Sequence, residues 1–181
     1  MTDYTDVVVL CEGKQDEVFL RRFLKSSGIN RRRIRVRRCP PGLGSGKQFV
    51  QNEYAKEAAE HRRRATFMHN IALIVMHDCD TSTVEECRAV LDPEGRQPGE
   101  RIALLFPKRS IETWIRFLVD GQAVDESIRY PELQRESECH DVADRLARKQ
   151  EYVLSAIVPS SLRDACPEIR RIFPTKVCRT V

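Results

Sequence analysis

The chain has 181 residues, a length typical of one compact domain with a real hydrophobic core. Lys and Arg number 31 and Asp and Glu number 27, so the net charge is only +4 although 32% of the residues are charged. No apolar run approaches the roughly 18 residues of a membrane span, which argues against a membrane channel or transporter. The seven cysteines form no C-x-x-C pair and no zinc-like spacing. Their odd number, without a signal peptide, predicts a reducing cytoplasm.

The first half of the chain alternates short apolar runs with helical patterns. The β-branched run at 7–11 is typical of a strand buried on both faces, and Gly13 allows a tight turn after it. Ile34 and Val36 alternate with arginines, which predicts a short strand near a sheet edge. In chain order we expect a strand at 7–11, a helix at about 15–27, the short strand, a Pro/Gly-rich loop at 39–46 and a helix at about 48–64.

The second half continues the alternation and then becomes helical and polar. Ser82 and Glu85 resemble a capping box, Ser110 is a candidate helix cap, and Trp114 is expected in the core rather than as a base-stacking platform. In chain order we expect a strand at 71–76, a helix ending near Leu91, a polar loop at 92–100, a strand at 102–106, the helix after Ser110 and a long helix at about 141–157.

This order predicts an α/β fold with a mostly parallel sheet of about four strands flanked by helices. Residues 1–120 are expected to form the catalytic domain, and residues 121–181 a helical extension packed on it. Cys11 and Cys79 lie in or beside the strand runs, where a thiol behaves as a small buried hydrophobic group.

Five acids lie at or just beyond predicted strand ends, where the crevice of an open parallel sheet is found. They are Glu12, Asp16, Asp78, Asp80 and Glu112. Two carboxylates about 4 Å apart repel by roughly 4 kcal/mol at an effective dielectric constant near 20, so the cluster needs a cation. Oxygen ligands suit Mg²⁺ or Mn²⁺, the usual ions of phosphoryl transfer. Acids at helix starts also stabilise the helix dipole, which is the alternative explanation for Glu12, Asp16 and Glu112 taken singly.

Arginines gather in two blocks, one between 31 and 38 and one at 62–64. Such runs are either solvated surface or anchors for a phosphate backbone, and a nearby carboxylate cluster favours the second interpretation. Gly42, Gly44, Gly46 and Lys47 do not form a Walker P-loop, because Pro41 and Gln48 stand where that motif needs Gly and Ser or Thr. Backbone amides of this loop remain candidates for phosphate contact. The residues expected to bind nucleic acid are Arg31, Arg32, Arg33, Arg35, Lys47 and Arg109.

Glu12-Gly13 after a β-branched run, followed by Asp78-x-Asp80 after a later apolar strand, resembles the Toprim domain. The added Asp16 and the Ser110-x-Glu112-x-Trp114 element resemble the overcoming-lysogenization-defect nucleases and related stand-alone anti-phage Toprim proteins. The resemblance covers about 7–119. Topoisomerases and primases tend to carry a glycine soon after Asp-x-Asp, whereas this chain continues Thr81-Ser82-Thr83, which disfavours those two activities.

The resemblance implies a Toprim-like, Rossmann-like fold and a metal-dependent nuclease holding one or two Mg²⁺ or Mn²⁺ ions. Asp78 and Asp80, two residues apart, are expected to share a face and ligate the main ion. Glu12 is a third ligand or the general base, and the resemblance places Asp16 and Glu112 around the metals. Lys108 or Arg109 is expected to neutralise the transition state.

The resemblance also implies an anti-phage effector controlled by an ATPase partner protein. Alternatives that stay open are a non-catalytic nucleic-acid or protein-binding module, a phosphotransferase or phosphohydrolase on small phosphates, and an RNA-processing nuclease. The chain is expected to act away from membranes, as a monomer or a homo-oligomer.

Overall fold

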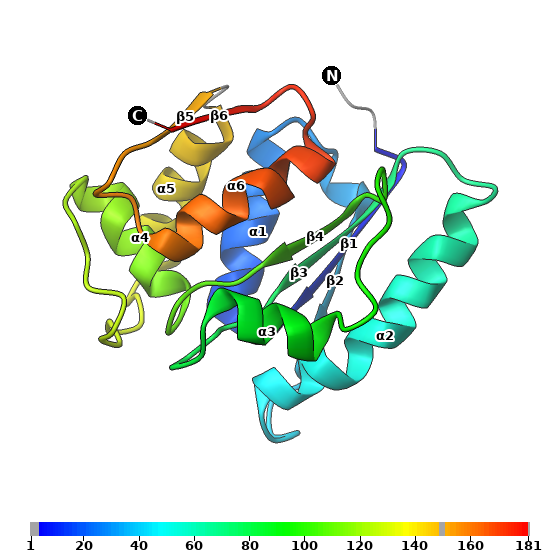
Figure 1. Ribbon diagram of the computed structural model, residues 1–181, viewed down its shortest axis with the longest axis horizontal. Helices are drawn as coiled ribbons and strands as arrows, with labels where there is room; N and C mark the ends of the chain where they lie inside the picture. Colours follow the sequence, from blue (N-terminus) through cyan, green and yellow to red (C-terminus); the bar gives the residue numbers. More distant parts are fainter. Residues whose placement is uncertain (1–3, 149–150, 181) are drawn as a thin grey trace.

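The computed structural model describes residues 4–148 and 151–180 and has a four-stranded, all-parallel sheet at its centre (Figure 1). The strand order is β2-β1-β3-β4, and β1 pairs with both β2 and β3, so that Val9 lies between Val36 and Ile74. The strands are β1 (Asp6–Cys11), β2 (Ile34–Arg38), β3 (Ile71–Met76) and β4 (Ile102–Leu105). The predicted α/β class, the parallel sheet and the edge position of the second strand are therefore confirmed.

Helices cover both faces of this sheet because its central strands are apolar on both sides. Alternate residues of β1, such as Val8 and Val9, belong to two separate hydrophobic cores. One core contains residues of α2 (Gly46–Ala65) and α3 (Val84–Leu91). The other contains residues of α1 (Lys14–Ser26), α4 (Ile111–Asp120), α5 (Glu136–Arg148) and α6 (Ser160–Ile172). Figure 1 shows α2 and α3 on one side of the sheet and α1 and α6 on the other.

Most predicted elements have the expected type, with small shifts at their ends. The capping box that opens α3 consists of Thr83 and Glu86 rather than Ser82 and Glu85, because the helix starts one residue later than expected. Trp114 is buried in the core, as predicted, and its Nε1 donates a hydrogen bond of 2.7 Å to Ser161 Oγ. In the described ranges, no helix is long and apolar enough to cross a membrane.

The C-terminal part is mainly helical, as predicted, but it also contains a small two-stranded sheet. The helix predicted at about 141–157 ends at Arg148 in α5, and the strand β5 (Glu151–Leu154) follows and pairs in parallel with β6 (Val177–Thr180). Residues 149–150 of the predicted helix lie outside the described residues. Both α5 and α6 contribute to the same core as α1, so this part is built into the main hydrophobic core.

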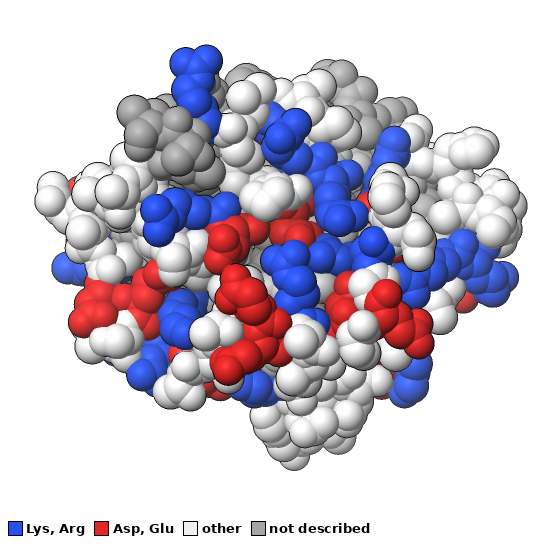
Figure 2. Space-filling view, viewed as in Figure 1, with Lys and Arg blue, Asp and Glu red and all other residues white. Residues whose placement is uncertain are grey.

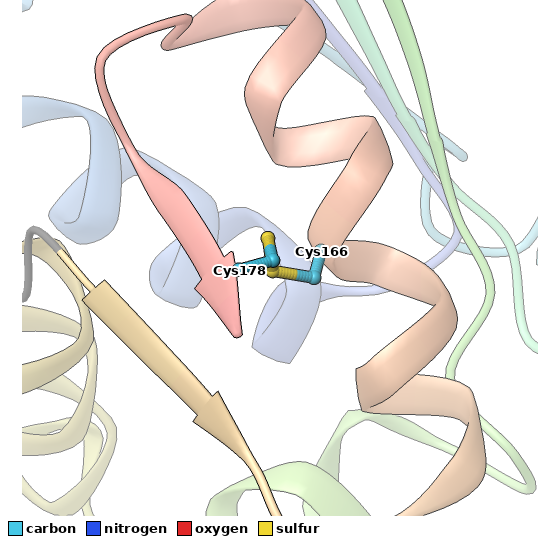
Figure 3. Close-up of a disulfide and its surroundings, with 2 residues drawn as sticks. All are labelled: Cys166 and Cys178. Carbon is cyan, nitrogen blue, oxygen red and sulfur yellow. A yellow bond between two sulfur atoms is a disulfide. The ribbon is translucent and has the colours of Figure 1, made fainter. Parts of the chain in front are cut away.

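A disulfide joins Cys166 on α6 to Cys178 on β6 (Figure 3). The Cα atoms are 6.2 Å apart, which is within the normal range for such a bond. The sequence analysis, which expected a reducing compartment, did not anticipate this bond. The five other cysteines are buried thiols, which confirms the prediction for Cys11 and Cys79.

One carboxylate, Glu168 of α6, closes the outer edge of the sheet at β4. Glu168 is 3% exposed, and its Oε2 accepts a hydrogen bond of 3.0 Å from the backbone N–H of Leu104. The same carboxylate accepts hydrogen bonds from both terminal nitrogens of Arg96. Nε of Arg96 also forms an ion pair with Asp92 Oδ2 at 3.0 Å. Since an exposed strand edge presents unpaired backbone groups, this contact both satisfies Leu104 and covers the edge.

Candidate metal centre

The acid cluster lies at the carboxyl ends of the strands, where the chain order reverses. From β1 the chain passes to β2 on one side, and it then returns across the sheet to β3 on the other side. Such a reversal opens a crevice between the ends of β1 and β3. Glu12 follows β1 directly, and Asp78 comes two residues after the end of β3. Asp16 lies in the first turn of α1, and Glu112 lies in the first turn of α4.

Asp78 is the centre of this cluster. Burial raises the pKa of Asp78 to about 10, and the charges of Asp16, Glu12, Glu112 and Asp80 all contribute to that rise. Its Oδ1 is buried and has no hydrogen-bond partner in the described part of the chain. A buried carboxylate that four other acids repel is stabilised by a proton or by a cation. The structure thus places the other four predicted acids close enough to Asp78 for their charges to affect it.

Asp16 combines a structural contact with membership of the cluster. Its Oδ2 accepts a hydrogen bond of 2.9 Å from the backbone N–H of Gly13, which caps the start of α1. Burial nevertheless raises the pKa of Asp16 to about 7, and the charges of Glu12 and Glu112 add to the rise that the Gly13 hydrogen bond opposes. A structural role at the start of α1 therefore accounts for one oxygen of Asp16 but not for the raised pKa of the carboxyl group.

Glu12 is held in place by a histidine that the sequence analysis missed. Its Oε1 lies 2.6 Å from Nδ1 of His77 and accepts a hydrogen bond of 2.8 Å from the backbone N–H of Asp78. Nε2 of the same ring lies 3.4 Å from Nε2 of Gln51 on α2. The amide nitrogen of Gln51 can only donate a hydrogen bond, so Nε2 of His77 is the acceptor. The neutral ring therefore carries its proton on Nδ1 and donates it to Glu12. The one available signal was the position of His77 beside Asp78, at the end of a buried strand.

Glu12 keeps one oxygen available for chemistry. Its side chain is 14% exposed, and its Oε2 makes no hydrogen bond within the described residues. An oriented carboxylate with one uncommitted oxygen suits either a metal ligand or a general base, as expected from the sequence.

Asp80 lies in a different environment from Asp78. The sequence predicted that their side chains share one face because the two residues are two positions apart, and that prediction is wrong. The strand ends at Met76, and Asp80 has a φ of 51°, so the alternation of a strand no longer applies there. Its Oδ2 lies 3.0 Å from Nζ of Lys47, and its side chain is 48% exposed. Burial acts to lower the pKa of Lys47, but the hydrogen bond to Asp80, together with the charges of Asp80 and other nearby groups, outweighs burial and raises that pKa.

The start of α2 touches the acid cluster directly. Gly46, its first residue, lies so close to Glu12 that a Cβ there would be 2.9 Å from Glu12 Cβ and 3.0 Å from its backbone oxygen. The positive end of a 20-residue helix dipole therefore lies beside this carboxylate. The glycine-rich segment is not a Walker motif, yet it brings Gly46 and Lys47 to the site.

Replacing Gly46 by Ala should disturb the site through Glu12. The added methyl group clashes with Cβ and the backbone oxygen of Glu12, so that Glu12 or the start of α2 must shift. We expect the apparent Mg²⁺ affinity to fall about tenfold, with a lower melting temperature. Gly13→Ala is the matched control, because its Cβ would meet only Asp16 Oδ2, at an ordinary 3.7 Å. Equal Mg²⁺ affinity in both variants, measured by titration calorimetry, would show that Gly46 does not position Glu12.

Lys108 and Arg109 lie in the loop between β4 and α4 and connect it to other loops. Nζ of Lys108 donates a hydrogen bond to the backbone oxygen of Ser82. Arg109 has a φ of 66°, and its Nε donates a hydrogen bond of 2.8 Å to the backbone oxygen of Ser127. Ser110 occupies the N-cap position of α4 without a side-chain capping bond, and its buried Oγ has no partner among the described residues. Whether either cation acts in catalysis stays a prediction.

Four of the arginines expected to bind nucleic acid, Arg31, Arg32, Arg33 and Arg35, lie toward the other end of the sheet, whereas Arg109 lies in the loop after β4. Arg31, Arg32 and Arg33 form a short 3₁₀ turn before β2, and Arg35 pairs with Asp6 at the start of β1. Asp6 and Glu12 lie six positions apart at the two ends of β1, a span of roughly 20 Å. These four arginines therefore do not flank the acids, although a role in nucleic-acid binding stays a prediction. In Figure 2 basic and acidic side chains are interspersed over the visible face.

The residues present fit a divalent cation, although their side chains are not arranged as a closed ligand shell. Among the described residues, no three His, Cys, Asp or Glu side chains form a ready-made metal site. Glu12, Asp16 and Asp80 instead take up hydrogen bonds from His77, Gly13 and Lys47. The buried Oδ1 of Asp78, which has no partner in the part of the chain that the structure describes, marks where the cluster lacks a positive group.

Comparisons with known proteins add no relative. No protein-family model, curated protein or solved structure matches this chain.

Proposed function

We propose that the protein is a metal-dependent nuclease of the Toprim type, which hydrolyses phosphodiester bonds at the acid cluster. The observation that carries the proposal is the state of Asp78. Burial and four neighbouring acids raise the pKa of Asp78 to about 10, and its Oδ1 has no hydrogen-bond partner among the described residues. A module that only binds protein or nucleic acid has no use for so repulsive a cluster. Perturbed carboxylates at the switch point of a parallel sheet are typical of a catalytic site.

The residues divide into ligands, a base and positioning groups. Asp78, Asp16 and Glu112 are the proposed ligands, with Asp80 completing the set once it leaves Lys47. When bound, Mg²⁺ or Mn²⁺ supplies charge neutralisation and Lewis-acid activation of a phosphate oxygen. Glu12 accepts the proton of the attacking water through Oε2, because its Oε1 is occupied by His77 and Asp78 N–H. His77, which directly follows β3 and contacts Gln51 of α2, orients Glu12.

Two nearby cations support a phosphate substrate. Lys47 pairs with Asp80 beside the cluster, and Lys108 lies in the loop after β4. We propose that Lys47 exchanges Asp80 for a substrate phosphate when the acids take up their cation. Control by an ATPase partner and a role in anti-phage defence rest on the family resemblance of the sequence, and action in the cytoplasm rests on its cysteine count.

The test is cleavage by the purified chain of a panel of single-stranded and double-stranded DNA and RNA. We expect cutting with Mg²⁺ or Mn²⁺ and none with EDTA. If the chain hydrolyses p-nitrophenyl phosphate but no polymer, a phosphohydrolase acting on small phosphates replaces the nuclease. If it binds Mg²⁺ without hydrolysing either, a non-catalytic module replaces it.

A further inference from the structure

A second polar cavity lies at the amino ends of the strands, on the opposite side of the molecule from the acid cluster. Its volume is about 560 Å³, and it lies between β1, β2, β3 and the C-terminal half of α2. Five arginines line it against three acids, which gives an excess of positive charge. The arginines are Arg32, Arg33, Arg35, Arg37 and Arg64.

Two of these guanidinium groups are fixed in place by one buried acid. Arg35 donates two hydrogen bonds to Asp6, with its Nε at 2.9 Å from Oδ1, and Arg64 Nη2 lies 2.6 Å from Oδ2. Burial acts to raise the pKa of Asp6, but these hydrogen bonds outweigh it and lower that pKa. Two positive charges therefore share one carboxylate, and one formal charge is left over. Oriented guanidinium groups with spare charge are well suited to phosphate.

The other two acids of the cavity are already neutralised. Glu57 pairs with Arg37 at 2.9 Å, and Glu60 pairs with Arg63 at 2.8 Å. By contrast, the side chains of Arg32 and Arg33 make no hydrogen bond or ion pair within the described ranges, although both line the cavity. Their backbone is fixed by Asn30, which accepts hydrogen bonds from both amides. An anion entering the cavity thus meets two uncommitted guanidinium groups on a rigid turn.

The size and floor of the cavity indicate more than a bare phosphate. Val8, Leu73, Ile71 and Met68 supply apolar surface beside the arginines. A volume of this order is typical of sites for small organic ligands, and it exceeds what one phosphate group fills. The combination of a cationic rim with an apolar floor suits a phosphate joined to a sugar and a base.

We propose that this cavity is a binding site for a nucleoside phosphate, separate from the acid cluster. The phosphate is bound by Arg32 and Arg33 together with the spare charge of Arg35 and Arg64, and the base lies on the apolar strip of β1 and β3. The ligand is either a free nucleotide or the phosphorylated end of a nucleic-acid strand, since both present the same group.

The test is titration calorimetry of the full chain with AMP at low salt and in EDTA. We expect binding by wild type, at least tenfold weaker binding by Arg32→Gln/Arg33→Gln, and no binding of adenosine. All three arginines of the turn are exposed, so the variants should fold. Arg31→Gln is the matched control: it neighbours Arg32 but lines a different cavity, beside α1, and should change affinity less than twofold.

Two further binding measurements distinguish this site from the proposed nuclease site and identify the source of the phosphate. Asp78→Asn should bind AMP like wild type, because the acid cluster takes no part. A 5′-phosphorylated dinucleotide that competes with AMP indicates a strand end, and failure to compete indicates a free nucleotide. Equal affinity for AMP and adenosine, equal losses in Arg31→Gln and Arg32→Gln/Arg33→Gln, or no AMP binding at all would overturn the proposal.

Discussion

Glu12→Gln should lower the rate of nucleic-acid cleavage at least a hundredfold while leaving substrate binding intact. Glutamine keeps the shape of the side chain and can still accept the hydrogen bonds of His77 and Asp78 through its oxygen. It loses the negative charge and cannot take a proton, and general-base catalysis typically contributes a factor of about 10² to 10⁴. The measurement is single-turnover cleavage with saturating Mg²⁺, together with a gel-shift assay in Ca²⁺.

Glu53→Gln is the control for the change of charge, because Glu53 lies on α2 and pairs with Arg37 and Lys56 outside the cluster. It should cut at the wild-type rate. Asp78→Asn should be as impaired as Glu12→Gln, and Glu112→Gln less so if Glu112 is a secondary ligand. Cutting within threefold of wild type by both Glu12→Gln and Asp78→Asn, free of contaminating nuclease, would place the chemistry elsewhere.

Glu168→Ala should lower the free energy of unfolding by about 3–5 kcal/mol, the usual result of breaking a buried ion pair. The side chains of Glu168 and Arg96 are 3% and 4% exposed, so the substitution leaves a buried guanidinium with only Asp92 as a charged partner. It also leaves the N–H of Leu104 without an acceptor. Urea unfolding followed by circular dichroism measures the change.

Glu138→Ala removes an acid of a similar kind from a surface pair and is the control. Glu138 and Arg135 are 39% and 78% exposed in their side chains, and such pairs contribute about 0–1 kcal/mol. A loss of less than 1 kcal/mol in Glu168→Ala would mean that the edge of β4 is held by other contacts.

The sequence was enough to predict that the acids lie near one another, because their proximity depends only on the direction of the strands that precede them. Continuous apolar runs identify buried parallel strands, and parallel strands bring their carboxyl ends to one edge. Glu12 and Asp78 therefore had to approach each other whatever the details of the loops. The same logic, applied to residues before a strand, would have placed Arg31, Arg32 and Arg33 at the opposite edge.

Contacts that depend on the direction of a side chain or on the conformation of a single loop could not be predicted from the sequence. The left-handed backbone of Asp80 breaks the alternation that the Asp-x-Asp spacing suggests. The contact of Gln51 with His77 needs the exact approach of α2, which no periodicity reports. The small β5–β6 sheet was missed because polar residues beyond 136 look helical, and a four-residue strand leaves little pattern.

The central claim, that the acid cluster holds a divalent ion, is tested most directly by the melting temperature with and without Mg²⁺ at about pH 6 and about pH 8. The pKa of Asp16 is raised from 3.8 to about 7 and that of Asp78 to about 10. The folded chain thus binds more protons than the unfolded chain above about pH 4, so the metal-free protein loses stability as pH rises through this window. Mg²⁺ replaces the lost protons and stabilises by mass action.

Wild type should gain more from Mg²⁺ at pH 8 than at pH 6, because protons compete with the cation at the lower pH. Asp78→Asn removes the most strongly perturbed charge, so the metal-free variant should melt above metal-free wild type at pH 8 and respond little to Mg²⁺. The same Mg²⁺ shift in wild type and Asp78→Asn at both pH values, or no shift in either, would contradict a metal centre at these residues.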